Sequence, residues 1–407
     1  MAAAGARFSQ AGVAAIYCVH GTFCGDDVLG LFTELEAWAP SLAKPLRRWS
    51  KQAIDAVIGE TANYTPEFAE RMATALSVNG PGRIPVRLFN WSSLNHHIAR
   101  ADGAVRLIDE LATLAEQLPL NDALVPSPLR GGLRRGAEVA SDLATSNTPP
   151  LTSPPQGEGD KQGIHPRIQL WAHSHGGNVF ALLTNLLGAD EAARQEFFHA
   201  SRSFFRPWIA TRPDMPAWDR VEKLLADRDH PLRQLKLDVV TYGTPIRYGW
   251  DAGGYHNLLH VIHHRPHPQH HAHRLQYPPW PHHVFTAEHG DYIQQVGIAG
   301  TNLPPLPLAL RTFLADWRLG KLLERDLGGW VRSRLKQGMR VHDEGTTLLV
   351  DYDDPHWLPW LHALGHAPYT RSHWLPLHCE LAAEHFYGAG GASESHSGGN
   401  KPNANST

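Results

Sequence analysis

Residues 168–180, with the sequence IQLWAHSHGGNVF, constrain the fold of this 407-residue chain more than any other segment. An apolar run ends just before Ser174, and residues 178–187 then have the continuous apolar spacing of a buried helix. A strand, a tight turn and a helix in this order are typical of a nucleophile elbow, which exposes a serine to a base. Ala172 and Gly176, two residues before and after the serine, leave room for the turn.

A second motif lies upstream, where an apolar strand pattern over residues 13–19 ends in HGTF at residues 20–23. Acyl transfer places negative charge on a carbonyl oxygen, and preorganised backbone N–H groups stabilise that charge. We expect one N–H from His175, the residue after the serine, and a second from Thr22. A simple strand-ending turn is the alternative interpretation of HGTF. His173 is interpreted as an elbow side chain without a chemical role.

These motifs resemble the α/β-hydrolase superfamily, and within it lipase-like enzymes with a GX-type oxyanion loop. AHSHGG is similar to the alanine-first elbow of some bacterial lipases, and VHGTF is similar to their oxyanion loop. The strand and GTP turn of residues 237–245 resemble the segment that follows the elbow helix, although many of those enzymes have His where this chain has Ile246. The resemblance implies an α/β-hydrolase fold and a serine hydrolase that cleaves a carboxylic ester, with no cofactor.

The same resemblance implies a catalytic triad whose members follow the chain order serine, acid, histidine. The histidine is expected in the loop before the closing helix, where His366 is favoured. His356, His362, His373 and His378 remain alternatives. The acid is expected beyond the strand pattern of residues 258–263, where Asp291 in a Gly-Asp turn is favoured. Asp251, Asp343, Asp351, Asp353 and Asp354 remain alternatives.

Strand and helix patterns alternate along the chain, which predicts a doubly wound, mostly parallel α/β sheet in one domain over residues 1–387. Further strands are expected at 83–91, 237–241, 258–263 and 347–352, and helices at 95–118 and 374–386.

Three segments stand outside this skeleton. Residues 119–163 and 388–407 are rich in Pro, Gly, Ser or Asn without periodicity, which predicts a disordered insertion and a disordered tail. Residues 191–235 are predicted to form a helical cap, and they include six aromatic residues. These aromatics either line an apolar substrate pocket or attach the cap to the body.

Composition excludes several function classes. The net charge of −3 gives no electrostatic reason to bind nucleic acid or an anionic membrane. Cys18, Cys24 and Cys379 have neither disulfide nor metal-site spacing. No window approaches the roughly 20 apolar residues of a membrane span, and the run before His20 is interpreted as a core strand rather than a signal peptide. We therefore expect a cytoplasmic protein, and the resemblance implies a small acyl ester or lipid as its substrate.

Histidine provides the competing signal, with 27 in the chain and eight of them crowded into residues 263–283. Imidazole is a good zinc or nickel ligand, yet the chain has no HExxH motif. A His-rich metal-binding protein therefore remains an alternative. A catalytically inactive binding module with the same fold is another, since fold does not determine function.

Overall fold

A computed structural model describes residues 1–22, 40–61, 63–77, 83–118, 165–205, 216–266, 274, 278–298, 309–323, 340–353 and 362–388. Six strands form one sheet in the order β2-β1-β3-β4-β5-β6, and every neighbouring pair is parallel. The strands are β1 (Val13–Val19), β2 (Val86–Phe89), β3 (Arg167–His173), β4 (Lys236–Tyr242), β5 (Asn257–His263) and β6 (Thr346–Val350). The expected α/β architecture with a parallel sheet is confirmed, and the strands lie within a few residues of their predicted positions.

The central strands are buried along nearly their whole length and are mostly apolar, because helices cover both faces of the sheet. Each of β3, β4 and β5 is buried at every position after its first residue. The edge strands β2 and β6 are partly exposed, and they are also the shortest of the six.

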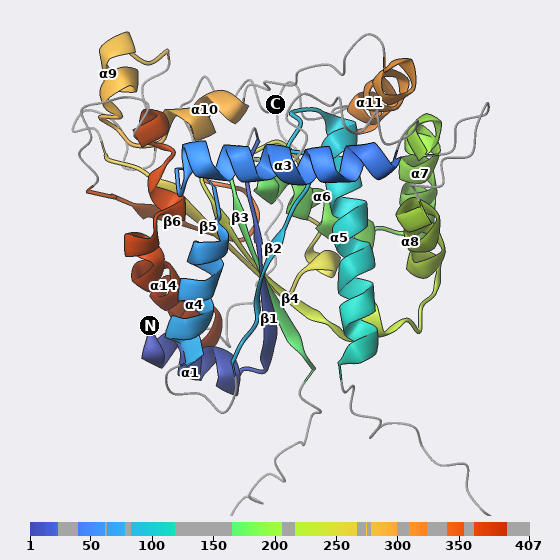
Figure 1. Ribbon diagram of the computed structural model, residues 1–407, viewed down its shortest axis with the longest axis horizontal. Coiled ribbons are helices and arrows are strands. Elements are labelled where there is room, and N and C mark those ends of the chain that lie inside the picture. Colours follow the sequence, from blue (N-terminus) through green and yellow to red (C-terminus); the bar gives the residue numbers. More distant parts are fainter. Residues whose placement is uncertain are drawn as a thin grey trace, which may run out of the picture.

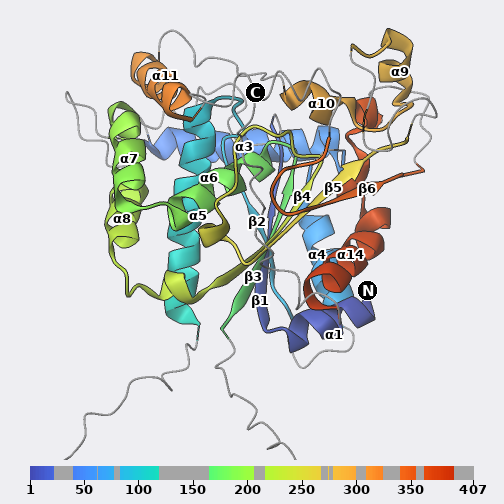
Figure 2. The same ribbon diagram turned by 180° about the vertical axis from the view of Figure 1, so that it is seen from behind.

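Helices pack on both faces (Figures 1 and 2). One face carries α1 (Ala2–Gln10), α4 (Pro66–Ser77) and α14 (Leu375–Tyr387). The other carries α5 (His97–Gln117), α6 (Gly176–Gly188), α7 (Glu191–Phe205), α8 (Pro216–Ala226) and α11 (Leu310–Leu323). Three further helices, α3 (Pro40–Ile58), α9 (Pro281–Thr286) and α10 (Tyr292–Ile298), lie toward the top of Figure 1. Short 3₁₀ turns are η1 (Pro231–Gln234), η2 (Ala252–Gly254), η3 (Ala363–Gly365), η4 (Pro368–Thr370) and η5 (Ser372–Trp374).

The N-terminal helix α1 was not expected from the sequence. Its apolar signal is short, since only Ala4, Gly5 and Phe8 are buried. It contacts both α4 and α14. A side chain at Gly5 would overlap the Leu76 carbonyl of α4, so close backbone approach rather than a wide apolar stripe holds this helix in place.

The strand order places a change of winding direction between β1 and β3. The chain moves outward from β1 to β2 at one edge, then returns past β1 to β3 and continues to β6. The loops after β1 and β3 therefore leave toward opposite faces, and in open parallel sheets ligands bind in the crevice at this point. Thr22 and Ser174 follow these two strands.

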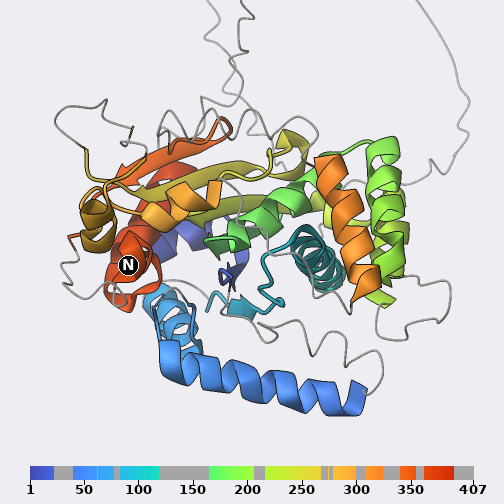
Figure 3. The same cartoon turned by 90° about the horizontal axis from the view of Figure 1, so that it is seen from above.

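The segment predicted as a helical cap contains α7, α8 and η1, and its residues 206–215 lie outside the described residues. Its described aromatic side chains pack on one another, with Trp218 and Phe205 stacked at 4.8 Å between ring centroids. Helix α7 lies against α11 and α8 lies against α5, at the side of the sheet (Figures 1 and 3). This packing favours the alternative in which the aromatics attach the segment to the body.

The predictions for the insertion, the tail and the cysteines fall partly outside the described residues. The insertion at 119–163 and the tail beyond Gly388 lie outside them, and so does Cys24. Cys18 and Cys379 are buried free thiols. Among the described helices, none combines the length and apolar character that crossing a bilayer requires. The single-domain assignment stays a prediction.

Buried histidines make the stability of this fold sensitive to acid. Burial lowers the pKa of His20 to about 4 and those of His97 and His378 to about 3. Each stays neutral in the folded protein and gains a proton on unfolding when the pH lies below the unfolded value of about 6.5. Stability is therefore retained above pH 6.5 and lost as the pH falls toward the folded pKa.

We predict that the free energy of unfolding decreases by about 2 kcal/mol per such histidine between pH 7.5 and pH 5, measured by urea titration. In a His378→Gln variant the side chain cannot be protonated, so the decrease in the free energy of unfolding between pH 7.5 and pH 5 is smaller by about 2 kcal/mol. The matched control His199→Gln changes an exposed histidine of α7 and keeps the wild-type dependence. An unchanged dependence in His378→Gln would contradict the assignment.

Candidate functional site

Ser174 occupies a strained turn between β3 and α6. Its φ of 53° lies in the left-handed region, which costs a non-glycine residue about 1–2 kcal/mol. The neighbouring strand holds the turn from both sides: the Ser174 N–H donates to the Tyr242 carbonyl at 2.9 Å, and the Thr244 hydroxyl donates to the Ser174 carbonyl at 2.8 Å. The turn lies between a strand and a helix as expected, but the Ser174 side chain is buried, with 4% of it exposed.

Two glycines after the serine are required by close contacts. A Cβ at Gly176 would lie 2.7 Å from the His20 carbonyl oxygen, and a Cβ at Gly177 would overlap the Thr244 side chain. The GG pair therefore brings the start of α6 against the ends of both β1 and β4. Small residues at these positions were expected, and the structure supplies the steric reason.

The loop after β1 lies directly on the serine. A Cβ at Gly21 would be 2.7 Å from Ser174 Cβ and 3.3 Å from its Oγ. The Trp91 indole donates to the His20 carbonyl at 2.9 Å, which ties this loop to the end of β2. Thr22 follows in the chain and is partly exposed, and Phe23 lies outside the described residues.

His175 occupies the N-cap position of α6 without a side-chain cap hydrogen bond, at the helix end where backbone N–H groups have no acceptor inside the helix. Burial holds the pKa of its imidazole well below the ordinary range, and the positive charges of Arg100 and Arg247 lower it further. The ring is therefore neutral. The two arginines, both buried, also favour negative charge near this helix end.

Asp291 and His366 form a buried pair at the same edge of the sheet. His366 Nδ1 donates to Asp291 Oδ2 at 2.6 Å, with the two side chains 4% and 0% exposed. The pair joins residues 75 apart in sequence. The other ring nitrogen of His366, Nε2, is also buried and has no hydrogen-bond partner among the described residues. This leaves one nitrogen oriented by a carboxylate and the other able to accept a proton.

Asp291 is held by a set of local hydrogen bonds. Its N–H donates to the carbonyl of His263, the last residue of β5, at 3.0 Å. Its Oδ1 accepts from the Gln294 N–H at 2.8 Å, which caps α10. The Tyr369 hydroxyl donates to Oδ2 at 2.9 Å and accepts from the His263 N–H at 2.7 Å. Burial raises the pKa of Tyr369 well above its usual value, so the phenol remains a donor.

Two glycines let the loops of the pair meet. Gly365 has φ 88°, and a Cβ there would overlap the Gly290 carbonyl. Gly243, at the end of β4, has φ 57°, and a Cβ there would overlap Tyr369 and Asp291. The turn at residues 241–245, which resembles a family motif, thus lies against Asp291 as well as Ser174.

His173 has a larger part in the site than its sequence position indicates. Its Nε2 donates to the His366 carbonyl at 3.2 Å, and the two rings lie 4.4 Å apart. His173, which immediately precedes Ser174 in the chain, therefore contacts His366 directly. Neither His173 nor Tyr369 was expected here, because their partners are distant in sequence and no local pattern marks them.

The described alternatives to Asp291 and His366 make other contacts. His373 is exposed beside Trp374, and His378 is buried against Tyr352 on the α14 face. His362 accepts from the Gly365 N–H and so supports the His366 loop. Asp251 caps η2, Asp351 pairs with Arg265, Asp343 and Asp353 lie near β6, and His356 and Asp354 lie outside the described residues.

These residues meet at the carboxyl edge of four adjacent strands. Gly21 in the loop after β1 contacts Ser174, which follows β3. Ser174 bonds to Tyr242 at the end of β4, and the next residue, Gly243, lies against Asp291 beyond β5. Figure 3 views the molecule from this side. Comparisons of the chain with protein-family models, with curated proteins and with solved structures found no match. The interpretation of this site therefore rests on its geometry.

We predict that Gly177→Ala lowers the free energy of unfolding by about 2–4 kcal/mol, since it forces Thr244 away and breaks its bond to Ser174. The control Gly249→Ala places its Cβ 3.5 Å from Glu344, an ordinary contact, and changes stability by less than about 0.5 kcal/mol. Urea titrations of both variants measure the difference. Equal stabilities would contradict the close packing assigned to the elbow.

Proposed function

We propose that this chain is a serine hydrolase of the α/β-hydrolase type, which cleaves carboxylic esters through an acyl-enzyme. The observation that carries the proposal is the buried His366, whose Nδ1 is held by Asp291 while its Nε2 has no partner among the described residues. A general base for a serine needs one ring nitrogen held by a carboxylate and the other free to take the hydroxyl proton. The left-handed backbone of Ser174 and its connection to His366 through His173 support it.

In this mechanism Ser174 Oγ attacks the ester carbonyl carbon while His366 Nε2 accepts the hydroxyl proton. Asp291 orients the ring and stabilises the imidazolium that results. The tetrahedral intermediate collapses when His366 returns the proton to the departing alkoxide, which leaves Ser174 acylated. Water, deprotonated by the same histidine, then attacks the acyl group, and the free acid and Ser174 are released.

The backbone N–H groups of Thr22 and His175 are proposed to hold the oxyanion. Gly21 keeps the Thr22 loop against Ser174, and His175 is the N-cap of α6, where the helix dipole favours negative charge. The neutral ring of His175 takes no part, and the buried Arg100 and Arg247 add positive charge behind this helix end.

A fluorophosphonate probe tests the proposal directly, because it reacts only with an activated serine. We predict that intact mass and peptide mapping find one adduct, at Ser174. Labelling is abolished in Ser174→Ala, and hydrolysis of p-nitrophenyl esters falls on the order of 10⁴-fold or more in His366→Ala. A series of acyl-chain lengths then defines the substrate preference.

The matched control is Ser93→Ala, since Ser93 is also buried and also has a left-handed backbone, with φ 58°. This variant keeps the adduct. A folded wild-type protein that is not labelled would overturn the enzyme proposal and favour a binding module with this fold. Hydrolysis that survives Ser174→Ala would overturn the mechanism.

Tyr369 is proposed as a positioning residue for the acid. We predict that Tyr369→Phe lowers kcat on the order of 10-fold or more, because Asp291 loses one hydrogen bond to a charged group, worth roughly 1.5–3 kcal/mol. KM stays nearly constant, since the hydroxyl faces Asp291 and His263 rather than Ser174. Loss of stability with unchanged kcat would show a structural role alone.

A further inference from the structure

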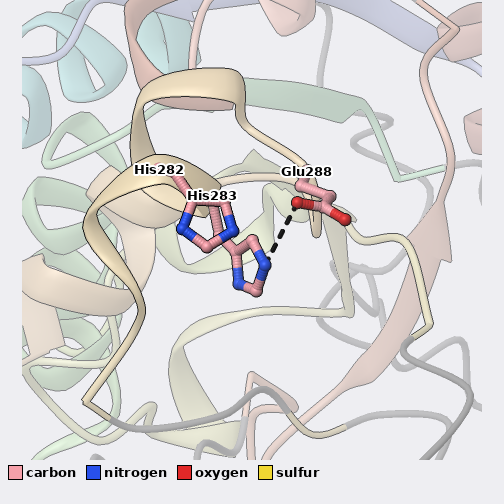
Figure 4. A group of neighbouring side chains, drawn as sticks. All are labelled: His282, His283 and Glu288. Atoms are coloured by element: carbon pink, nitrogen blue, oxygen red, sulfur yellow. Dashed lines mark ion pairs between the residues drawn. The ribbon is translucent and has the colours of Figure 1, made fainter.

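His282, His283 and Glu288 form a cluster of metal-ligating side chains outside the residues assigned to the reaction. The two histidines lie on α9, and Glu288 follows the turn that ends it. Figure 4 shows the three side chains directed toward one another. The local fold brings them together: Ala287 takes a left-handed conformation, and the Glu288 N–H donates to the His283 carbonyl at 3.0 Å.

The spacing of the donor atoms fits a small dication. His283 Nε2 lies 3.2 Å from Glu288 Oε2, and each of the three residues has a ligand atom within 4.8 Å of the others. Ligands about 2.0–2.1 Å from a tetrahedral zinc ion lie roughly 3.3 Å apart. The His283–Glu288 distance already matches that edge. His282 is exposed, so its ring can turn to complete the set.

The chemistry of the donors selects the metal. Two imidazole nitrogens and one carboxylate oxygen suit Zn²⁺ and its neighbours rather than Mg²⁺ or Ca²⁺, which take oxygen ligands. The ring of His289 packs edge-on against His283 at 5.0 Å and limits its orientation. We propose that His282, His283 and Glu288 bind one Zn²⁺, with water in the fourth position, and that this ion steadies the loop that carries Asp291.

The connection to Asp291 is short. Glu288 precedes it by three residues, and the Gly290 N–H donates to the Ala287 carbonyl at 3.1 Å between them. Gly290 pairs with His264 and lies against Gly365. Helices α9 and α10 both contact η3, which precedes His366. An ion that holds Glu288 to the two histidines of α9 therefore also fixes the segment that orients Asp291 and His366. The catalytic value of this coupling rests on the proposed function, whereas metal binding does not.

Zinc binding is measured on the full chain, purified without a histidine tag and stripped with a chelator, by titrating ZnCl₂ against a chromophoric competitor. The wild type is expected to hold one equivalent on the order of 100-fold more tightly than either His283→Ala or Glu288→Gln. Glu288→Gln is conservative and half-exposed, so it reports on binding even if His283→Ala is unstable. The control His199→Ala removes an exposed histidine of α7 and keeps the tight equivalent.

Equal affinities of the wild type and Glu288→Gln would overturn the site. The coupling has its own readout, amide hydrogen exchange of residues 287–298. Zn²⁺ is expected to slow this exchange in the wild type and not in Glu288→Gln, and tight binding without slower exchange would overturn the link to Asp291. Both measurements are independent of activity. A protein that binds Zn²⁺ but is not labelled at Ser174 would contradict the proposed function alone.

Discussion

The backbone of Ser174 depends on hydrogen bonds from the strand beside it. A left-handed serine is unfavourable by itself, and it persists here because the Tyr242 carbonyl and the Thr244 hydroxyl engage its N–H and C=O on opposite sides. Thr244 in turn needs Gly177, whose missing side chain gives it space. The turn is thus a property of β3 and β4 together, and the in-register parallel pairing of these two strands is what sets it.

The local parts of the site were predictable because their signals are local. A strand, a small residue, a serine and two glycines lie within ten positions, and the sterics that require the glycines act between immediate neighbours of the turn. The loop after β1 was predictable for a similar reason, since parallel strands end at one edge. The expected strands agree with the sheet because buried parallel strands are mostly apolar, and the sequence shows this pattern directly.

The meeting of Asp291 with His366 was expected only from a family resemblance in chain order. Their contact depends on Gly365 meeting Gly290 and on the Tyr369 hydroxyl bridging to β5, and neither is visible as a spacing. The contact of His173 was not expected for the same reason: its partner is a backbone carbonyl 193 residues away. The cluster of His282, His283 and Glu288 could not be recognised from composition, because the segment before it contains many histidines. The turn at Ala287 brings only two of them to Glu288.

The contact between Gly21 and Ser174 has a stereochemical consequence. With only a hydrogen separating the Gly21 backbone from the serine Cβ, this side of Ser174 has no room for a bound molecule. Under the proposed function, an ester carbonyl must therefore approach Oγ from another side, with its oxygen toward the N–H groups of Thr22 and His175. These two requirements would select one prochiral face of the carbonyl, so a substrate with a stereocentre beside it is expected to react at different rates in its two mirror-image forms.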